Sequence, residues 1–205
     1  PHPGLGGGGA PLPDGPGLLF LDPAGNDVGG NTSNKAGFTA SLSYNAQLSQ
    51  ELESAQTGMF AMEWDIYVDN ILDDSTRDRG AIMMVGDDAD AGGDPNSGSS
   101  ERYVFMSFWA LDGGGDDPTD TMTLIAREPG DTYSDSSAWR ALVSGLSFDT
   151  WYNIKVACDV AAGTYAVYVN DVLAAADVIS YSGASSLTHI SFAQWDDGAA
   201  SFYVD

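Results

Sequence analysis

Residues 62–70, MEWDIYVDN, hold the densest set of side chains that could do chemistry. On a regular strand, Glu63, Asp65, Tyr67 and Asp69 point to one face, and the residues between them point to the other. Carboxylates accept hydrogen bonds from sugar hydroxyls, and an aromatic ring stacks on a sugar face. This face therefore predicts glycan binding, although the solvated side of an ordinary amphipathic strand shows the same alternation without any function.

Three tryptophans lie at predicted strand ends beside polar loops. Trp109 precedes LDGGGDD, Trp139 follows a loop that contains Tyr133, and Trp195 precedes Asp-Asp-Gly. Rings in such places suit sugar binding, but sandwich folds also use large rings to fill the space between their sheets. We predict one groove that combines the strand face with these rings. The predicted glycan-binding residues are Glu63, Asp65, Tyr67, Trp109, Trp139 and Trp195.

The loop 86–101, GDDADAGGDPNSGSSE, supplies the oxygen ligands that calcium prefers. Asp88, Asp90 and Asp94 surround a pair of glycines, as in the first half of an EF-hand loop. The loop departs from an EF-hand because Gly92 and Ser99 occupy ligand positions, and no flanking helices are predicted. The prediction is therefore a looser calcium site, and the acidic loop 111–120 offers a second place for one.

Nucleophilic and lyase chemistry have weaker support. A serine triad would have to use His189, and no nucleophile elbow surrounds His189 or its neighbour Ser191. We interpret His189 as a strand residue with a structural hydrogen bond. A polysaccharide lyase needs a cation that neutralises a uronate carboxylate, and Arg102, Arg127 and Arg140 are the candidates.

Net charge narrows the choice of partners. The 205 residues include 30 acidic and 7 basic side chains, for a formal net charge of −23. Because like charges repel, nucleic acid and anionic membranes are disfavoured partners. Solubility in a saline environment and dedicated ion sites are alternative reasons for the acidity. Cys158 is the only cysteine, so no disulfide forms within the chain, and no apolar run is long enough to insert into a membrane.

Short apolar runs between turn-rich loops predict an all-β antiparallel sandwich, which positions these side chains. Residues 1–17, PHPGLGGGGAPLPDGPG, are interpreted as an arm or linker, and 18–205 as one sandwich domain. Residues 46–55 are predicted to form a helical turn or two, and Trp64 and Trp151 are assigned to the core. The predicted strands are 18–21, 37–44, 59–68, 80–85, 103–111, 121–127, 139–142, 152–159, 164–170, 172–176, 189–195 and 201–204.

The clearest pattern is 148–174, FDTWYNIKVACDVAAGTYAVYVNDVLA, which predicts two alternating strands joined by a glycine turn. Its W-x-x-I-x-V and Y-x-V-Y-V-N strands resemble the late hairpin of laminin-G-like domains in the concanavalin A-like superfamily. Residues 190–205, ISFAQWDDGAASFYVD, resemble the closing strands of the same domains. The resemblance implies a jelly-roll fold and an extracellular protein. The superfamily includes hydrolases, lyases, lectins and adhesive modules.

Two sets of site residues follow from this resemblance alone. The E-x-D-x-x-x-D spacing is similar to the E-x-D-x-x-x-E signature of family 16 glycoside hydrolases, which implies Glu63 as nucleophile, Asp65 as its orienting partner and Asp69 as acid. Asp69 is a methylene shorter than the glutamate it would replace. Jelly-roll carbohydrate-binding modules often tie their first and last strands with calcium, which would involve Asp22 and Asp205.

Three functions remain open at this point. The first is a secreted or cell-surface, noncatalytic carbohydrate-binding module, stabilised by calcium, for a neutral or cationic glycan. The second is a structural surface or filament subunit that self-associates through its arm, 1–17, and its edge strands. The third is a glycoside hydrolase, for which retaining chemistry needs the carboxyls of Glu63 and Asp69 about 5 Å apart.

Overall fold

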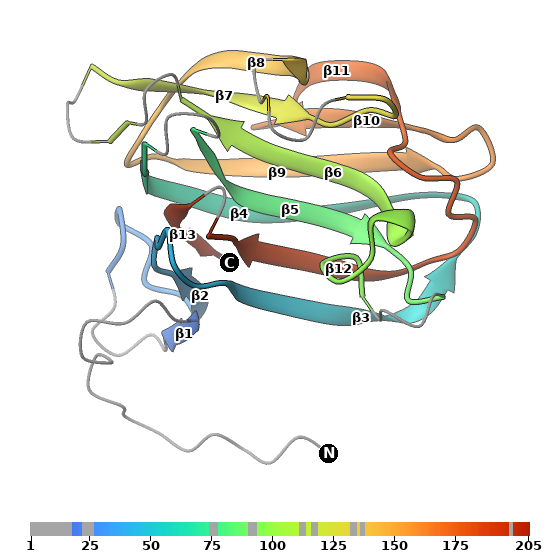
Figure 1. Cartoon of the computed structure of the whole chain (residues 1–205), viewed down its shortest axis with the longest axis horizontal. Coiled ribbons are helices and arrows are strands. Elements are labelled where there is room, and N and C mark those ends of the chain that lie inside the picture. Colours follow the sequence, from blue (N-terminus) through green and yellow to red (C-terminus); the bar gives the residue numbers. More distant parts are fainter. Residues whose placement is uncertain are drawn as a thin grey trace.

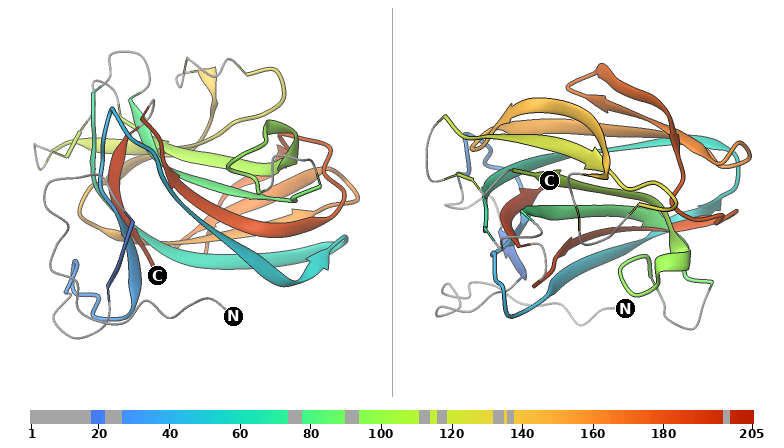
Figure 2. Two further views of the ribbon diagram at one scale, coloured as in Figure 1. Left: turned by 60° about the horizontal axis from the view of Figure 1, so that its bottom comes forward. Right: turned by 45° about the horizontal axis from the view of Figure 1, so that its top comes forward.

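A computed structural model describes residues 18–21, 27–73, 78–89, 94–110, 114–115, 119–131, 135, 138–196 and 199–205. These residues form two antiparallel sheets that lie face to face, which confirms the predicted all-β jelly-roll sandwich (Figures 1 and 2). The predicted arm, 1–17, lies outside the described residues. Within the described part of the chain, no helix has the length and apolar character needed to cross a bilayer.

Seven strands form one sheet and six form the other, and in Figure 1 each sheet runs from the bottom to the top of the view. The seven-stranded sheet has the order β1 (Leu18–Leu21), β2 (Lys35–Phe38), β13 (Ala200–Val204), β4 (Met59–Ile71), β9 (Trp151–Asp159), β10 (Thr164–Val169) and β11 (Val172–Ile179). The six-stranded sheet has the order β3 (Ala46–Gln56), β12 (Leu187–Gln194), β5 (Arg79–Gly86), β6 (Arg102–Trp109), β7 (Thr121–Ala126) and β8 (Arg140–Ser147). A 3₁₀ turn, η1 (Ser99–Glu101), precedes β6.

The hairpin predicted at 148–174 is confirmed as β9 and β10. Gly163 closes the first turn with a φ of 69°, a left-handed conformation that glycine adopts without steric cost. The second turn, between β10 and β11, places Asn170 and Asp171 at φ values of 50° and 63°. Two consecutive positive φ values match the right-handed twist of the flanking strands, and Asn and Asp tolerate them better than most residues do.

Residues 46–55 are a strand, so the predicted helical turn is wrong. β3 pairs with β12 along its length, with Ser191 opposite Ser49 and Phe192 opposite Leu48. Ala46 and Leu48 pack toward the core between polar residues. The many Ala, Gln, Glu and Leu residues favour a helix locally, but pairing with an apolar strand outweighs this weak preference.

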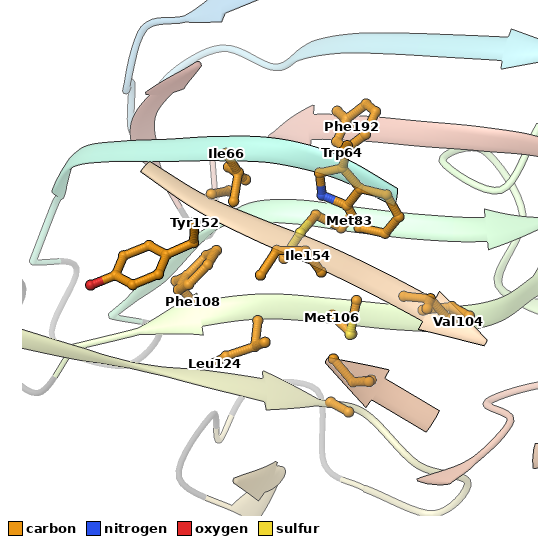
Figure 3. Packing of buried hydrophobic residues seen from close by; sticks show 14 of the residues in the cluster. Trp64, Ile66, Met83, Val104, Met106, Phe108, Leu124, Tyr152, Ile154 and Phe192 are labelled. Atoms are coloured by element: carbon orange, nitrogen blue, oxygen red, sulfur yellow. The ribbon is translucent and has the colours of Figure 1, made fainter. Parts of the chain in front are cut away.

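The core lies between the two sheets and is built from alternate residues of the central strands. Figure 3 shows Trp64 and Ile66 of β4 facing Met83, Met106 and other apolar side chains across the sandwich. Trp64 packs edge-to-face on Phe192 with ring centroids 5.6 Å apart, which confirms its core assignment. Each large side chain that is fully buried in this way stabilises the fold by about 1.5–3 kcal/mol.

Trp151 is not in the core, which corrects the second tryptophan assignment. Along β9 the buried residues are Tyr152, Ile154, Val156 and Cys158, so Trp151 lies one residue out of phase and points to the outer face of its sheet. Tyr152 takes the inward position, and its hydroxyl accepts a hydrogen bond from the Ser147 amide at 2.8 Å. Trp151 therefore becomes available to a surface site.

Candidate functional site

The outer face of β4 presents the side chains expected from its alternation. Trp64, Ile66 and Val68 are buried in the core, so Glu63, Asp65, Tyr67 and Asp69 point away from it. Neighbouring strands β13 and β9 pair with β4 on its two sides. Directly paired residues of an antiparallel sheet share a face. The residues of β13 and β9 that pair with Asp65 and Tyr67 therefore also lie on the outer face, beside these side chains.

An aromatic row crosses three strands at Tyr67. Tyr203 of β13 and Trp151 of β9 both pair with Tyr67, one on each side. The ring centroids of Tyr67 and Trp151 lie 5.4 Å apart with planes at 48°, and those of Tyr67 and Tyr203 lie 6.0 Å apart with planes at 68°. All three side chains are half-buried. The row therefore offers three partly accessible rings, tilted against one another instead of forming one flat surface.

A polar row runs beside the aromatic row. Asp65 pairs with Asn153 of β9, and the Asn153 Nδ2 amide donates to Asp65 Oδ1 at 2.9 Å. On the other side, the backbones of Asp65 and Asp205 exchange two hydrogen bonds, of 3.0 and 3.1 Å. In the next row, Glu63 pairs with Lys155, and Lys155 pairs with Tyr168 of β10. Carboxylates and an amide thus lie next to the rings.

Two carboxyl groups meet at the other side of the aromatic row. The Tyr67 hydroxyl donates to Asp149 Oδ1 at 3.0 Å, and the Asp149 amide donates to the Val68 carbonyl at 3.0 Å, which fixes the turn after β8 against β4. Burial and the adjoining Asp149 carboxyl raise the pKa of Asp69 above its ordinary value. Burial and the same Asp149 raise the pKa of Tyr67 to about 12, so Tyr67 keeps its proton at neutral pH.

The segment 27–35 packs against two of the three rings of the aromatic row, Tyr67 and Trp151. The Trp151 indole donates to the Val28 carbonyl at 2.7 Å. Gly29, with a φ of 54°, lies so close that a Cβ added there would come 2.5 Å from the Tyr67 ring. Further along, the buried Lys35 ammonium donates to the Asn31 and Ser33 carbonyls at 3.0 and 2.7 Å. This segment holds Tyr67 and Trp151 in place.

The predicted groove is not assembled, because its tryptophans lie on the opposite side of the sandwich. Trp109, Trp139 and Trp195 pack with a second apolar cluster that includes Ile82 and Met84. These two alternate along β5 with the core residues Met83 and Val85, which places the cluster on the outer face of the six-stranded sheet. Glu63, Asp65 and Tyr67 lie on the outer face of the other sheet.

On that opposite face Trp139 is buried, whereas Trp109 and Trp195 are half-buried. Trp139 is 4% exposed and packs edge-to-face on Phe105 at 5.1 Å. Trp195 lies 5.9 Å from the same ring, and its indole donates to Asn96 Oδ1 at 2.6 Å. Arginines complete the layer: the guanidinium carbons of Arg79, Arg102 and Arg127 lie 4.7–5.0 Å from the rings of Trp139, Phe105, Trp195 and Tyr181. This face is a second packed layer of rings and guanidinium groups, in which Trp109 and Trp195 are half-buried, as are the three rings of the aromatic row.

The predicted catalytic pair is not brought together. Glu63 and Asp69 lie on one continuous strand, six residues apart. At about 3.3 Å per residue, their Cα atoms are separated by about 20 Å. A retaining pair needs carboxyls about 5–5.5 Å apart, and an inverting pair about 6.5–9.5 Å. The carboxyl that does meet Asp69 belongs to Asp149, a residue that the strand motif does not contain.

The predicted metal ligands are dispersed. Among the described residues, no three His, Cys, Asp or Glu side chains gather where they could hold a metal ion. Asp88 is exposed, Asp94 Oδ1 caps its own turn by accepting from the Asn96 amide at 3.1 Å, and Asp90 and Asp22 lie outside the described residues.

The corner at Asp205 does not fit calcium. Burial favours a higher pKa for Asp205, but hydrogen bonds from Asn31 and Ser33 and the nearby Lys35 ammonium lower the pKa below its ordinary value. The ammonium also takes the Asn31 and Ser33 carbonyls, which are the kind of oxygen that calcium would need.

The histidine and the remaining arginine have structural contacts. His189 Nδ1 lies 2.9 Å from Thr188 Oγ1, as the structural interpretation predicts, and buried Ser191 bonds to Ser49 at 2.7 Å. Arg140 forms an ion pair with Glu128 at 3.0 Å. Its guanidinium also donates to the Ala176 carbonyl of β11 at 2.9 Å.

Comparison with known proteins places the fold but not the ligand. No family model matches the chain, and no curated protein sequence matches it. A solved sialidase is similar with a TM-score of 0.52 and 11% identity, over 83% of this chain and only 14% of the sialidase. The alginate lyase Aly36B, solved with an alginate trisaccharide, has a TM-score of 0.50 and 11% identity over 85% of this chain and 79% of the lyase.

A carbohydrate recognition domain, that of Emp46p in its potassium-bound form, has a TM-score of 0.46 and 13% identity, and the match covers 93% of this chain and 84% of that domain. At these identities, structural likeness speaks for the fold alone. Together with the two antiparallel sheets, the likeness to the sialidase and to Aly36B shows that this chain has the concanavalin A-like jelly-roll fold.

Proposed function

We propose that this chain is a noncatalytic glycan-binding domain whose ligand lies on the outer face of the seven-stranded sheet. The observation that carries the proposal is the alignment of an aromatic row, Tyr203, Tyr67 and Trp151, with the polar pair Asp65 and Asn153. Rings with an apolar face and a polar edge suit sugar faces. A carboxylate has about four acceptor sites, so the bond from Asn153 still leaves Asp65 able to accept sugar hydroxyls.

Binding without catalysis is favoured by the spacing of the acids. The motif carboxyls Glu63 and Asp69 are too far apart along β4 to flank one glycosidic bond, as argued above. Proteins with this fold include a carbohydrate recognition domain and an alginate lyase, which supports a carbohydrate as the class of ligand. An extracellular location belongs to the same proposal, and so does stabilisation by calcium, for which the acidic loops 86–101 and 111–120 are the proposed places and the Asp205 corner is not.

The test is a glycan array probed with the purified chain, once in calcium and once in chelator. Two variants identify the face: Tyr203→Ala removes a ring of the aromatic row, whereas Tyr44→Ala removes a ring that is 61% exposed outside both sheets. We expect binding to one glycan class, lost in the Tyr203 variant and retained in the Tyr44 variant. Stabilisation by calcium is tested separately. If calcium stabilises the chain, its unfolding temperature should be lower in chelator than in calcium.

Three results would contradict the proposal. An array on which no glycan binds would remove the function, and equal loss in both tyrosine variants would remove the assignment to this face. Release of shorter fragments from a bound glycan would show catalysis, and would direct attention to the Asp69 and Asp149 carboxyls.

A further inference from the structure

Negative charge surrounds the rings of the candidate face. Within the described residues, two ammonium groups lie among or beside the aromatic and polar rows of this face. One of them, Lys35, is 4% exposed and donates to two carbonyls. The other is Lys155, opposite Glu63. The acids of the same rows are Glu63, Asp65, Asp69, Asp149 and Asp205. Five carboxylates against two ammonium groups give this face the sign of the whole chain, whose net charge is −23.

This charge selects among glycans. A uronate or sulfate group placed on the aromatic row would face the carboxylates of Asp65 and Asp149 with no exposed guanidinium close by on β4, β9 or β13. Arg79 and Arg102, which could neutralise an acidic sugar, are buried in the aromatic layer of the opposite sheet. Like charges that meet directly at an interface repel each other, so acidic polysaccharides are disfavoured ligands.

A cationic sugar would be attracted to this face, because aromatic rings and carboxylates both bind an ammonium group. The faces of Tyr67, Trp151 and Tyr203 attract a cation through their negative quadrupole. Asp65, one row away, accepts charge-assisted hydrogen bonds, which are about twice as strong as neutral ones. A neutral sugar would gain the stacking but not the ionic bond.

We propose that the preferred glycan of this face carries protonated amino groups, as in a chain of unacetylated amino sugars. The inference rests on the proposed function and adds the substrate class. The ammonium of one such sugar lies between the aromatic row and the Asp65 carboxylate, and that of the next sugar along the chain lies near Glu63. The sugar ring stacks on the part of the aromatic row that segment 27–35 leaves accessible. Since the rings are tilted by 48° and 68°, they suit single soluble chains better than the flat surface of a crystalline polysaccharide.

Calorimetric titration with matched oligosaccharides tests this inference. β-1,4-linked glucosamine oligomers and their fully N-acetylated counterparts have the same length and linkage and differ in charge. At mildly acidic pH and low salt, we expect the amine form to bind at least about tenfold more tightly, which corresponds to about 1.4 kcal/mol. Alginate oligomers, which are polyanionic, are expected not to bind.

A matched pair of double variants separates a site from general attraction between a polycation and an acidic protein. Glu63→Gln with Asp65→Asn removes two carboxylates from the face, and Glu51→Gln with Glu53→Gln removes two from exposed positions of β3 in the other sheet. Both change the net charge equally. We expect the first double variant to lose at least about fivefold in affinity for the amine oligomer, since it removes charge-assisted hydrogen bonds. The second should lose less than about twofold.

The outcomes distinguish this inference from the proposed function. Equal or tighter binding of the N-acetylated oligomer overturns the inference and leaves glycan binding standing. Equal weakening by both double variants also overturns it, because the attraction then comes from net charge. If neither oligomer binds while another glycan on the array does, the amine specificity is wrong. If no glycan binds, both proposals fail.

Discussion

The Tyr67 hydroxyl donates a hydrogen bond to Asp149 at 3.0 Å, and the same Asp149 carboxyl adjoins Asp69. The contact joins the turn after β8 to the strand that carries the candidate site. It also concentrates negative charge. Tyr67 donates a hydrogen bond to the Asp149 carboxyl, whereas the Asp69 carboxyl has the like-charged Asp149 as its neighbour. The free energy of unfolding therefore depends on whether Asp69 holds a proton.

Asp69→Asn is expected to stabilise the protein at neutral pH. The pKa of Asp69 is raised on folding, first by burial and then by Asp149, so the folded chain holds this proton more tightly than the unfolded chain. The resulting stability is present at low pH and is lost as pH rises from the ordinary carboxyl pKa through the raised value. Because Asp69 is only partly withdrawn from water and much of its surface is still exposed, the gain at neutral pH should stay below about 1 kcal/mol. Urea unfolding between mildly acidic and neutral pH measures it.

The control for this pH series is Asp88→Asn, which removes an exposed carboxylate just after β5, on the other sheet. If the two variants respond to pH in the same way, the effect reflects net charge and not the contact with Asp149.

Gly29→Ala should weaken glycan binding, because a methyl group there would come 2.5 Å from the Tyr67 ring and displace it. Gly30→Ala supplies the comparison. It has a similar left-handed backbone, with a φ of 84°, but a Cβ there would meet no atom within 4 Å. Both variants should lose about 1–2 kcal/mol of stability from backbone strain. Affinity for the array ligand should fall in the first alone, and a fall in both would show that the segment matters without Tyr67.

Tyr103→Phe is expected to destabilise the fold by about 1–2 kcal/mol. The buried Tyr103 hydroxyl of β6 lies 2.7 Å from the Asp159 carbonyl and 3.0 Å from the Thr164 carbonyl, so it ties the six-stranded sheet to the β9–β10 hairpin. Phenylalanine keeps the ring and removes the donor. Denaturant unfolding monitors the change, and an unaltered midpoint would mean that water replaces the bond.

Arg140→Ala should loosen the edge at which the two sheets meet. The guanidinium of Arg140 bonds to the Glu128 carboxylate and to the carbonyls of Ala176 and Asp177, and Glu128 accepts from the Ile179 amide at 3.0 Å. These contacts occupy backbone groups that the edge strand β11 would otherwise offer to another chain. We expect a loss of about 1–3 kcal/mol and concentration-dependent association, read by sedimentation.

Arg140→Lys is the matched variant, because it keeps the charge but has no planar group that can bond several acceptors at once. It should recover part of the stability. A variant Arg140→Ala that remains monomeric at high concentration would show that β11 is protected by other means.

Local alternation predicted much of the sheet but not the neighbours of each strand. The period-two pattern of β4 identified its outward residues, and the glycine turn identified the β9–β10 hairpin. The phase of Trp151 was misjudged, because its aromatic neighbour Tyr152 suits the inward position equally well and only packing decides between them.

The composition of the site could not be read from sequence for a related reason. Tyr203, Asn153 and Asp149 join Tyr67 through register and turn geometry, which depend on residues far apart in the chain. Conversely, Trp109 and Trp195 have the local signs of a binding residue, an aromatic ring before an acidic loop. Nothing in a short stretch of sequence indicates on which of the two sheets that stretch will lie.

The arginine and aromatic layer of the six-stranded sheet has a consequence for the solution around the protein. The chain has only seven Lys and Arg residues. Three of them are less than 9% exposed, namely Arg79, Arg102 and Lys35, so their positive charges are withdrawn from the surface. The domain must then hold a cloud of small cations, as a polyelectrolyte does. A cationic glycan that binds would release part of this cation cloud, so its affinity would fall steeply as the salt concentration rises. The same counterion release governs the binding of basic proteins to DNA, where the signs of the charges are reversed.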